Sequence, residues 1–218
     1  MKTAMKREEK TTLQEYTGFQ VAFDFFNEEL FNGSLPQLLI VLTSDAKAKR
    51  RGHYCHDKFE SRIGNAKVPE LALYPNTFGD RTDEEILSTL VHEMVHCQQN
   101  HGGKPGRRGY HNVEWGRMMK AVGLHPSDTG EAGGKESGER VSHYIVEGGL
   151  YQQAYRKLAI TGLKLHWQSG MAGKGGVGKP KPPSSKIKYT CTCGLRAWAK
   201  PGVSLMCAEC EELMEETA

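Results

Sequence analysis

The spacing of apolar residues along the chain predicts helices mixed with short strands. In several segments an apolar residue recurs every three or four positions, which is the spacing of one face of a helix. These segments are residues 12–31, a stretch that begins after Thr82, residues 113–122 and residues 151–160. Short apolar or alternating runs are typical of strands instead. They occur at residues 38–43, 52–59, 70–74 and, more weakly, 141–146, whereas residues 123–140 are expected to be loop.

The expected helix after Thr82 has a clear start and two different sides. Thr82 and Glu85 form the S/T-x-x-E pattern of a capping box, in which each side chain accepts a hydrogen bond from the other residue's backbone N–H. The apolar residues between positions 86 and 94 point, on average, away from His92 and His96. We therefore expect the helix to bury one face and to turn both imidazoles toward a cleft or toward water.

The run from His92 to His96 reads HExxH, a pattern with a physical basis. Side chains four residues apart share a helix face, so His92 and His96 can bind one zinc ion together. Glu93 lies beside them and can take a proton from a zinc-bound water. The pattern therefore predicts a zinc-dependent peptidase with Glu93 as its catalytic base. His143 or Tyr144 could stabilise the negative oxygen that forms during hydrolysis.

A catalytic zinc needs a third protein ligand, and three downstream residues could supply it. We favour His111, because the Gly- and Lys/Arg-rich loop before it is long enough to bring the chain back over the two histidines. His101 is one residue short of the HExxHxxGxxH spacing, in which Gln99 also replaces the glycine. Glu114 is a weaker alternative and could instead orient a histidine.

The six cysteines point to a second zinc site rather than to disulfides. Four of them form two closely spaced pairs near the C-terminus: Cys191, Cys193, Cys207 and Cys210. Two pairs at this separation predict a structural zinc site in a ribbon of two short hairpins. About thirty residues bury too little apolar surface to fold alone, so the ion would be needed for folding. Cys55 and Cys97 stand alone, which fits a reducing compartment.

Positive charge is concentrated in the last third of the chain. Residues 148–208 contain ten Lys or Arg and no Asp or Glu, although the net charge of the whole chain is only +3. A stretch of this kind is expected of a surface that neutralises phosphates, so we expect DNA as a partner. The candidate contacts are Lys174, Lys179, Lys181, Lys186, Lys188, Arg196, Trp198 and Lys200. Trp198 and Tyr189 could stack on bases or simply pack over the cysteine site.

Gly, Pro and Lys dominate residues 170–188, which we interpret as a linker. Within it, residues 173–179 match the first seven positions of a phosphate-binding P-loop. The eighth position is Pro180 where Ser or Thr is needed, and Pro182 and Pro183 forbid the helix that would have to follow. We therefore expect no nucleotide ligand.

The sequence predicts neither export nor membrane insertion. No run of residues is apolar enough for a membrane span, and residues 1–12 lack the apolar stretch of a secretory signal. We therefore expect a cytoplasmic, DNA-associated protein that makes no membrane contact.

Four stretches of the chain also carry a resemblance to a known family. They are residues 27–36 (NEELFNGSLP), 92–96 (HEMVH), 111–115 (HNVEW) and the cysteine-rich residues 189–210. In this order they are similar to the first-helix exit, the metal helix, the third-ligand segment and the zinc ribbon of the SprT-like zinc metalloproteases, notably bacterial and phage members. The resemblance spans nearly the whole chain. HExxH alone occurs in many proteases, but the order of the four pieces is fairly specific.

The resemblance implies an α+β fold with two folded parts. The first is a zincin-like mini-protease domain, with helices around a short sheet, and the second is a small zinc ribbon. We accordingly expect the protease domain at residues 1–168, the basic linker at residues 169–188 and the ribbon at residues 189–218.

The resemblance also implies two zinc ions and an activity. One ion would be catalytic and held by His92, His96 and His111, and the other would be structural and held by the four cysteines. Eukaryotic members cut proteins crosslinked to DNA. We therefore expect a metalloprotease that acts on DNA-associated proteins, DNA–protein crosslinks among them, with water activated by Glu93. The alternative is a DNA-binding protein without proteolytic activity, in which both zinc sites are structural.

Overall fold

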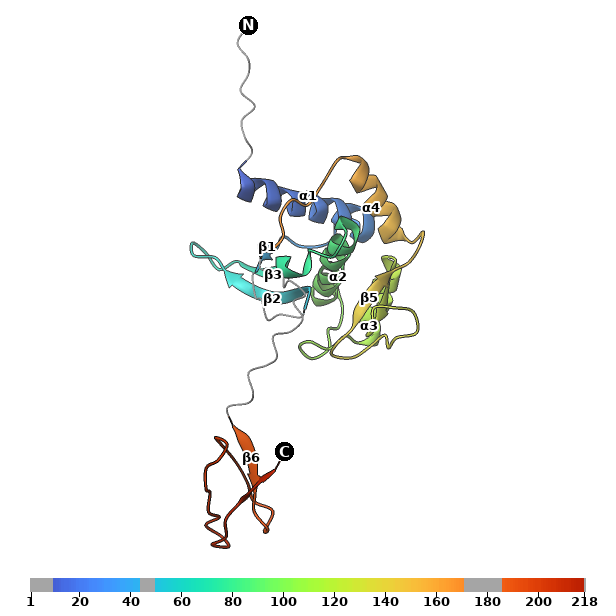
Figure 1. The fold of residues 1–218 in the computed structure, drawn as a ribbon. Coiled ribbons are helices and arrows are strands. Elements are labelled where there is room, and N and C mark those ends of the chain that lie inside the picture. The colour runs from blue at the N-terminus through green and yellow to red at the C-terminus, as the bar shows by residue number, and fades with distance from the viewer. Residues whose placement is uncertain (1–9, 44–49, 171–185, 218) are drawn as a thin grey trace. The chain divides into compact units, whose positions relative to one another are not determined.

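The chain falls into two units in the structure, a computed structural model that describes residues 10–43, 50–170 and 186–217. The units are Met1–Ala172 and Gly173–Ala218. Figure 1 shows the elements of both units. Most of the expected linker lies outside the described residues, and so does the P-loop-like stretch.

A three-stranded sheet crosses the N-terminal unit. Its strands are β1 (Leu39–Leu42), β2 (Gly52–Glu60) and β3 (Lys67–Leu73), in the order β1-β3-β2. Strand β3 is parallel to β1 and antiparallel to β2, so β3 is central and β2 forms an edge. A short 3-10 turn, η1 (Pro75–Thr77), follows β3 and leads the chain toward the next helix.

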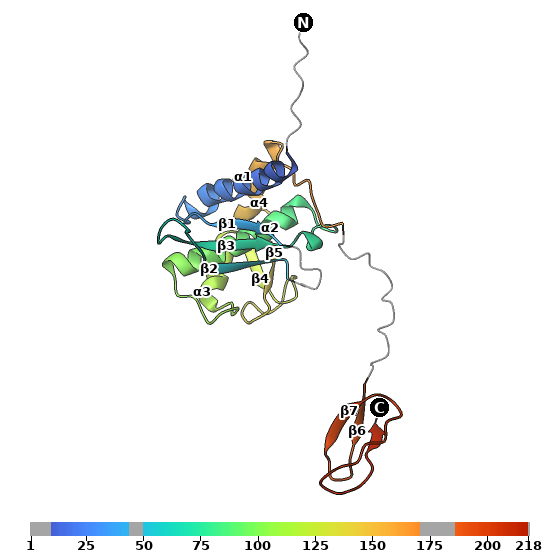
Figure 2. The same cartoon turned by 90° about the vertical axis from the view of Figure 1, so that its left-hand side faces the viewer.

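The described part of this unit also has four helices, and one of them contacts the other three. Helix α2 (Asp83–Gly102) packs against α1 (Thr11–Phe31), α3 (Val113–Ala121) and α4 (Leu150–Ile160). Figures 1 and 2 show α1 and α4 side by side on one side of the unit. Apolar side chains from all four helices and from β3 form one buried cluster. No helix among the described residues is long and apolar enough to cross a membrane.

These elements confirm the predicted α+β fold and most of the expected helices and strands, with one clear exception. Residues 123–140 were predicted to be loop, yet they begin with β4 (Leu124–Ser127), which pairs antiparallel with β5 (Ser142–Ile145). The segment Leu-His-Pro-Ser contains a proline and has no apolar alternation, so nothing local in it indicates a strand. Its conformation depends on pairing with β5, which lies beyond a loop.

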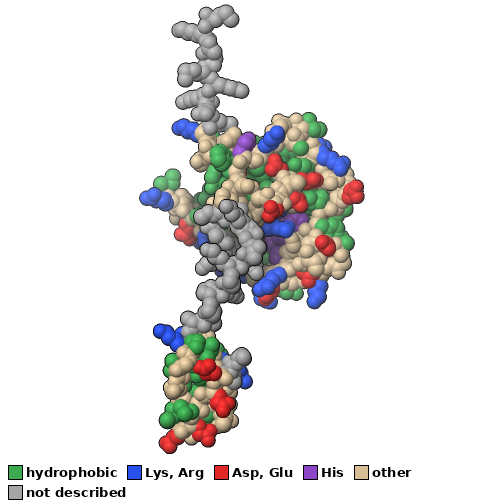
Figure 3. Space-filling model, in the orientation of Figure 1, with side chains coloured by type: hydrophobic (Ala, Val, Ile, Leu, Met, Phe, Trp, Pro, Cys, Tyr) green, Lys and Arg blue, Asp and Glu red, His purple; other side chains and the backbone are tan. Residues whose placement is uncertain are grey.

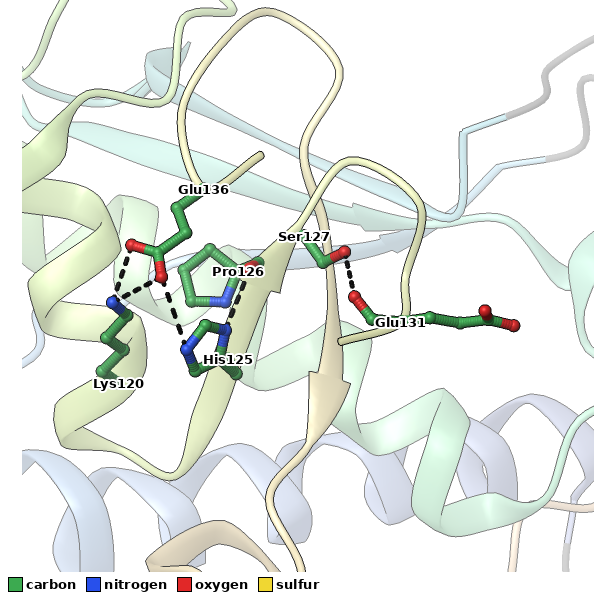
Figure 4. Close-up of polar contacts among 6 residues, drawn as sticks. All are labelled: Lys120, His125, Pro126, Ser127, Glu131 and Glu136. Carbon is green, nitrogen blue, oxygen red and sulfur yellow. Dashed lines mark hydrogen bonds and ion pairs between the residues drawn. The ribbon is translucent and has the colours of Figure 1, made fainter. Parts of the chain in front are cut away.

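The remainder of residues 123–140 folds back onto α3 and β4. The Nζ of Lys120 on α3 donates to both carboxylate oxygens of Glu136 at 2.7 Å, as Figure 4 shows. The Nε2 of His125 lies 3.4 Å from the same carboxylate. The Oγ of Ser127 donates to the backbone oxygen of Glu131. These contacts give the segment a defined path on its way to β5.

Helix α2 is buried on nearly all sides rather than on one face. Every residue from position 86 to position 95 is buried, the polar Ser88 and Thr89 included. The apolar side meets the other helices, and further contacts come from β2, β3 and β5. Of the two predicted surroundings of the histidine side, a cleft or water, the structure does not fit open water, because His92 is buried and His96 is half-buried.

The C-terminal unit is a small antiparallel sheet with four clustered cysteines, as expected of a zinc ribbon. Strand β6 (Ile187–Thr190) lies between β7 (Arg196–Ala199) and β8 (Glu215–Thr217). Tyr189 on β6 is 1% exposed, and its hydroxyl lies 2.7 Å from a carboxylate oxygen of Glu216. This tyrosine therefore packs inside the ribbon.

The turn between α3 and β4 gives a test of the packing. Gly123 has a φ of +84°, and a Cβ there would lie 2.7 Å from the backbone N of Leu150. Gly109 also has a positive φ, +74°, but a Cβ there would meet nothing within 4 Å. We expect Gly109→Ala to lower the free energy of unfolding by about 1–2 kcal/mol, the cost of the left-handed conformation. Gly123→Ala should cost at least ~1 kcal/mol more, because the backbone of α4 must also move. Urea denaturation followed by circular dichroism measures both, and equal losses would contradict the described packing.

Candidate metal centre

Side-chain hydrogen bonds define the start of α2, the helix that carries His92 and His96. The Thr82 hydroxyl oxygen accepts from the backbone N of Glu85 at 3.2 Å, and a Glu85 carboxylate oxygen accepts from the backbone N of Thr82 at 2.8 Å. This reciprocal pair is the capping box that the sequence predicted. Residues 92 and 96 then project from adjacent turns of one helix face, with ring centroids 5.2 Å apart.

His111 joins the two helix histidines from a separate part of the chain. Its ring centroid lies 5.6 Å from that of His92 and 4.9 Å from that of His96. One ligand atom from each residue lies within 4.8 Å of the other two. Three imidazole nitrogens that converge in this way match the protein donor set of a catalytic zinc, which leaves one position open.

Neither alternative third ligand belongs to this cluster. His101 is exposed at the end of α2. Glu114 accepts hydrogen bonds from the Nε2 of Gln99 and from the backbone N of Lys104, both at 2.8 Å. Glu114 thus holds the loop before His111 against α2. Neither of these two hydrogen bonds involves a histidine of the cluster.

A backbone bridge holds His111 in place. The backbone N of His111 donates to the oxygen of Gly138 at 2.8 Å, and the backbone N of Gly138 donates to the oxygen of His111 at 3.0 Å. The ring Nδ1 of His111 lies 3.1 Å from the same Gly138 oxygen. A carbonyl can only accept, so Nδ1 carries the proton and the lone pair is on Nε2. His111 therefore presents Nε2 as its metal ligand.

His143 and Ser88 orient His92 in a similar way. The Ser88 hydroxyl donates to the oxygen of Glu85, so it accepts from His143 Nε2, 2.9 Å away. The Nδ1 of a neutral His143 is then an acceptor for His92 Nδ1 at 3.0 Å. This chain of hydrogen bonds leaves Nε2 of His92 free to bind a metal ion.

His143 and Tyr144 were both considered as donors to the reacting oxygen, and neither is placed for that role. Both ring nitrogens of His143 already have partners. Tyr144 is the next residue on β5 and projects to the opposite face, where it stacks on His125 with ring centroids 4.9 Å apart.

Burial keeps the three imidazoles neutral, which is the form that binds metal. It lowers the pKa of His92 well below its ordinary value, with a further contribution from His143, and that of His96 to about 3. The pKa of His111 is lowered for the same reason. Trp115 is fully buried against all three rings and lies 4.3 Å from that of His111, centroid to centroid.

Glu93 lies inside the unit next to the start of β2. The side chain is 5% exposed, and a Cβ on Gly52 would lie 2.8 Å from its Oε1, so only glycine permits this approach. Burial raises the pKa of Glu93 to about 8, and the charge of Arg50 opposes this rise. A cation at the histidines would also favour the ionised carboxylate. Glu93 is thus a desolvated carboxylate on the turn between the two helix histidines.

The four ribbon cysteines form the second candidate metal site. Sγ–Sγ distances are 3.8 Å for Cys191–Cys210, 3.7 Å for Cys193–Cys207 and 4.0 Å for Cys207–Cys210. Four thiolates at about 2.3 Å from one zinc ion would be separated by about 3.8 Å in a tetrahedron. The donor set therefore fits a structural zinc ion.

The predicted DNA contacts are only partly described. Lys174, Lys179 and Lys181 lie outside the described residues. The other five, Lys186, Lys188, Arg196, Trp198 and Lys200, belong to the ribbon or its first strand. Trp198 is 62% exposed and lies opposite Lys188 in the ladder between β6 and β7. Of the two aromatic candidates, only Trp198 offers an exposed ring.

Local patterns gave little indication of the residues around the histidines. Ser88 shares the histidine side of the helix, which was the one sequence signal for its role. Gly52, Gly138 and His143 come from distant segments, and nothing in their local sequence marks them as neighbours of the site.

The His143 contact makes a prediction about metal affinity. We expect His143→Ala to weaken zinc binding at the histidine cluster about 10- to 100-fold, because His92 loses the acceptor that fixes its ring. Competition with a chelator measures this on the full chain. His101→Ala removes an exposed histidine from the end of α2 and should leave the affinity unchanged. Equal affinity for His143→Ala and the unaltered chain would refute the proposed hydrogen-bond chain.

Comparison with known proteins agrees with this geometry. A model of the SprT-like family matches residues 19–132, which is more than half of the chain and includes all three histidines and Glu93. Searches of curated proteins and of solved structures give no match. The chain therefore belongs to the SprT-like family.

Proposed function

We propose that this protein is a zinc-dependent endopeptidase that acts on proteins associated with DNA. The observation that carries the proposal is the buried Glu93, next in sequence to His92, together with three imidazoles that bring one ligand atom each within 4.8 Å of one another. A purely structural site has no use for a desolvated carboxylate next to the ligands, because burying it costs free energy. Membership of the SprT-like family also favours a metallopeptidase.

Each residue of the site would have a distinct role in peptide hydrolysis. His92, His96 and His111 would hold zinc, which supplies a Lewis acid that polarises a peptide carbonyl and makes water easier to deprotonate. Glu93 takes the proton of the attacking water on its carboxylate. The same carboxyl group then gives this proton to the leaving amine, which restores the starting state. Trp115 and the surrounding core exclude bulk water from the far side of the histidines.

Replacement of Glu93 tests the enzymatic proposal. We expect Glu93→Gln to reduce cleavage of an unfolded protein substrate by about 10²–10⁴-fold, since the glutamine cannot accept the proton. The zinc content of the purified protein should stay at two ions per chain. Glu60→Gln is the matched control, because Glu60 is exposed and forms its ion pair with Lys67. Full activity in Glu93→Gln would show that the base is wrongly assigned.

The alternative function is that of a DNA-binding protein with two structural zinc ions. The two proposals predict different results when His111 is replaced by alanine. Loss of a ligand from an open catalytic site should abolish activity and leave the fold intact, because the core of the unit does not include His111. Unfolding of the N-terminal unit in His111→Ala would favour the structural alternative.

The DNA part of the proposal rests on charge and on one exposed ring. Residues 148–208 carry no acidic side chain, and Trp198 stands on β7 between Arg196 and Lys200 in the sequence. Base stacking on an aromatic side chain contributes about 1–3 kcal/mol per base, and nearby cations add phosphate contacts. We propose that this part of the ribbon binds single-stranded DNA and brings the peptidase to its substrates.

Substitution of Trp198 tests the DNA contact. We expect Trp198→Ala to weaken binding of a labelled single-stranded oligonucleotide about 5- to 150-fold at fixed salt, measured by fluorescence anisotropy. Leu213→Ala removes an apolar side chain of similar exposure, 64%, from the same ribbon and should bind normally. Unaltered binding by Trp198→Ala, or an affinity that does not change with salt, would contradict this role.

A further inference from the structure

Arg81, immediately before the capping box of α2, places its guanidinium group along the histidine side of that helix. Its Nη2 lies 2.6 Å from the hydroxyl oxygen of Thr89 and also donates to the backbone oxygen of Glu85. Thr89 is one turn before His92 and Glu93. The positive charge of Arg81 is thus held about one helical turn from the proposed reaction site.

Neighbouring residues connect Arg81 with the carboxylate of Glu93. A Cβ on Gly52 would lie 3.0 Å from the Cγ2 of Thr89 and 2.8 Å from the Oε1 of Glu93. Thr89 and Glu93 therefore flank the same glycine at the start of β2. Arg81, Thr89, Gly52 and Glu93 form one continuous row from the cationic group to the catalytic base.

One edge of the Arg81 guanidinium has no partner. Both hydrogen bonds described above use Nη2, whereas Nη1 is buried and has no hydrogen-bond partner in the described part of the chain. An unpaired donor that is withdrawn from water is destabilising, and in a native structure it calls for an explanation. An acceptor that arrives with a ligand would supply one.

The charge of a second arginine, Arg51, acts on the first. Burial, together with the charge of Arg51, lowers the pKa of Arg81 to about 10. Arg51 is exposed and directly precedes Gly52. Glu85 attracts both arginines, but its carboxylate already accepts from the backbone N and the hydroxyl of Thr82. Figure 3 shows Lys and Arg side chains next to histidines on the visible face of the N-terminal unit.

We propose that Arg81 and Arg51 form a substrate subsite that binds a carboxylate next to the scissile bond. The inference rests on the proposed function, because it concerns the substrate of the same metal site. Because Nη1 of Arg81 is shielded from solvent, an incoming carboxylate would have to displace the atoms that cover it. It would then accept from Nη1 and reduce the repulsion between the two guanidinium groups. The carboxylate can come from a Glu or Asp side chain or from the end of a peptide chain. We assign the subsite to an acidic side chain, since an endopeptidase must accept residues on both sides of the bond.

Peptide hydroxamates test the subsite without requiring catalysis. Three probes with the same backbone are compared on the zinc-loaded full chain by calorimetry. The first has Glu next to the hydroxamate and a C-terminal amide, the second has Gln and the same amide, and the third has Gln and a free C-terminal carboxylate. We expect the Glu probe to bind about tenfold or more tightly than the Gln amide, as one charge-assisted hydrogen bond would give. Preference for the third probe over the first would overturn the assignment to a side chain.

Three variants connect the preference to the arginines. Arg81→Gln should reduce the Glu-to-Gln ratio to near one and leave the affinity for the Gln amide unchanged. Because Arg81 also contacts α2, Arg51→Gln serves as a second variant at an exposed position and should reduce the ratio in part. Arg81→Lys keeps the charge and should retain a measurable preference. A ratio that is near one in the unaltered chain, or unchanged in both Gln variants, overturns the proposal, and so does failure of all three probes to bind.

The same measurements separate this proposal from the function on which it rests. If the chain cleaves proteins but binds the Glu and Gln probes equally, the subsite is wrong and the peptidase stands. If the Glu probe is preferred through Arg81 but no protein is cleaved at any pH, the subsite stands and the enzymatic activity is wrong.

Discussion

The short backbone bridge between His111 and Gly138 is the constraint on which the metal centre depends. Two histidines on a helix can share an ion, but they cannot complete a three-nitrogen donor set. The third ligand follows a loop of Gly, Pro and basic residues, which by itself has no preferred position. Two backbone hydrogen bonds and one ring hydrogen bond join His111 to Gly138 and fix the position of this histidine. The segment after β4 is therefore part of the site, although it contributes no ligand.

Burial then determines the chemistry of the assembled site. An imidazole in the interior is more stable neutral than charged, and a carboxylate in the interior is more stable protonated. Before an ion binds, the site is therefore a group of neutral histidines with a carboxyl group that tends to keep its proton. A divalent cation reverses the preference of the carboxyl group for its protonated form, because the charge of the cation stabilises ionised Glu93. Arg50 acts in the same direction from the start of β2. Metal binding and ionisation of Glu93 would thus be coupled through one electrostatic environment.

The sequence was informative where a local pattern determines structure, and uninformative where contacts between distant segments determine it. The capping box at Thr82 and Glu85 and the spacing of His92 and His96 depend on the geometry of one helix, and both are found in the structure. The loop before His111 is rich in glycine and positive charge, and its length alone suggested that the chain could return to the helix. By contrast, β4 and the burial of α2 on nearly all sides depend on segments that are distant in the sequence, so the local pattern did not reveal them.

Two further points concern the direction of single side chains. The sequence suggested His143 as one residue that could stabilise the reacting oxygen, and no local pattern indicated where its ring points. The alternation of side chains along β5 places it against His92, with Ser88 on its other side. Tyr189 and Trp198 were equally plausible as stacking residues, and only the pairing of β6 with β7 and β8 shows which ring is covered. In each case the side-chain direction follows from strand pairing, which no short motif encodes.

The two candidate ions would have different physical roles. Within the described part of the ribbon, the buried residues are Tyr189, Cys191 and Cys207, two of which are proposed ligands. This small buried surface cannot offset the loss of conformational entropy when the ribbon becomes ordered. The fold of the ribbon would therefore depend on its ion. The N-terminal unit has a large apolar core drawn from four helices and a sheet. Its ion can therefore bind to a fold that already exists, and the free energy of binding can be used to polarise substrate rather than to hold the chain together.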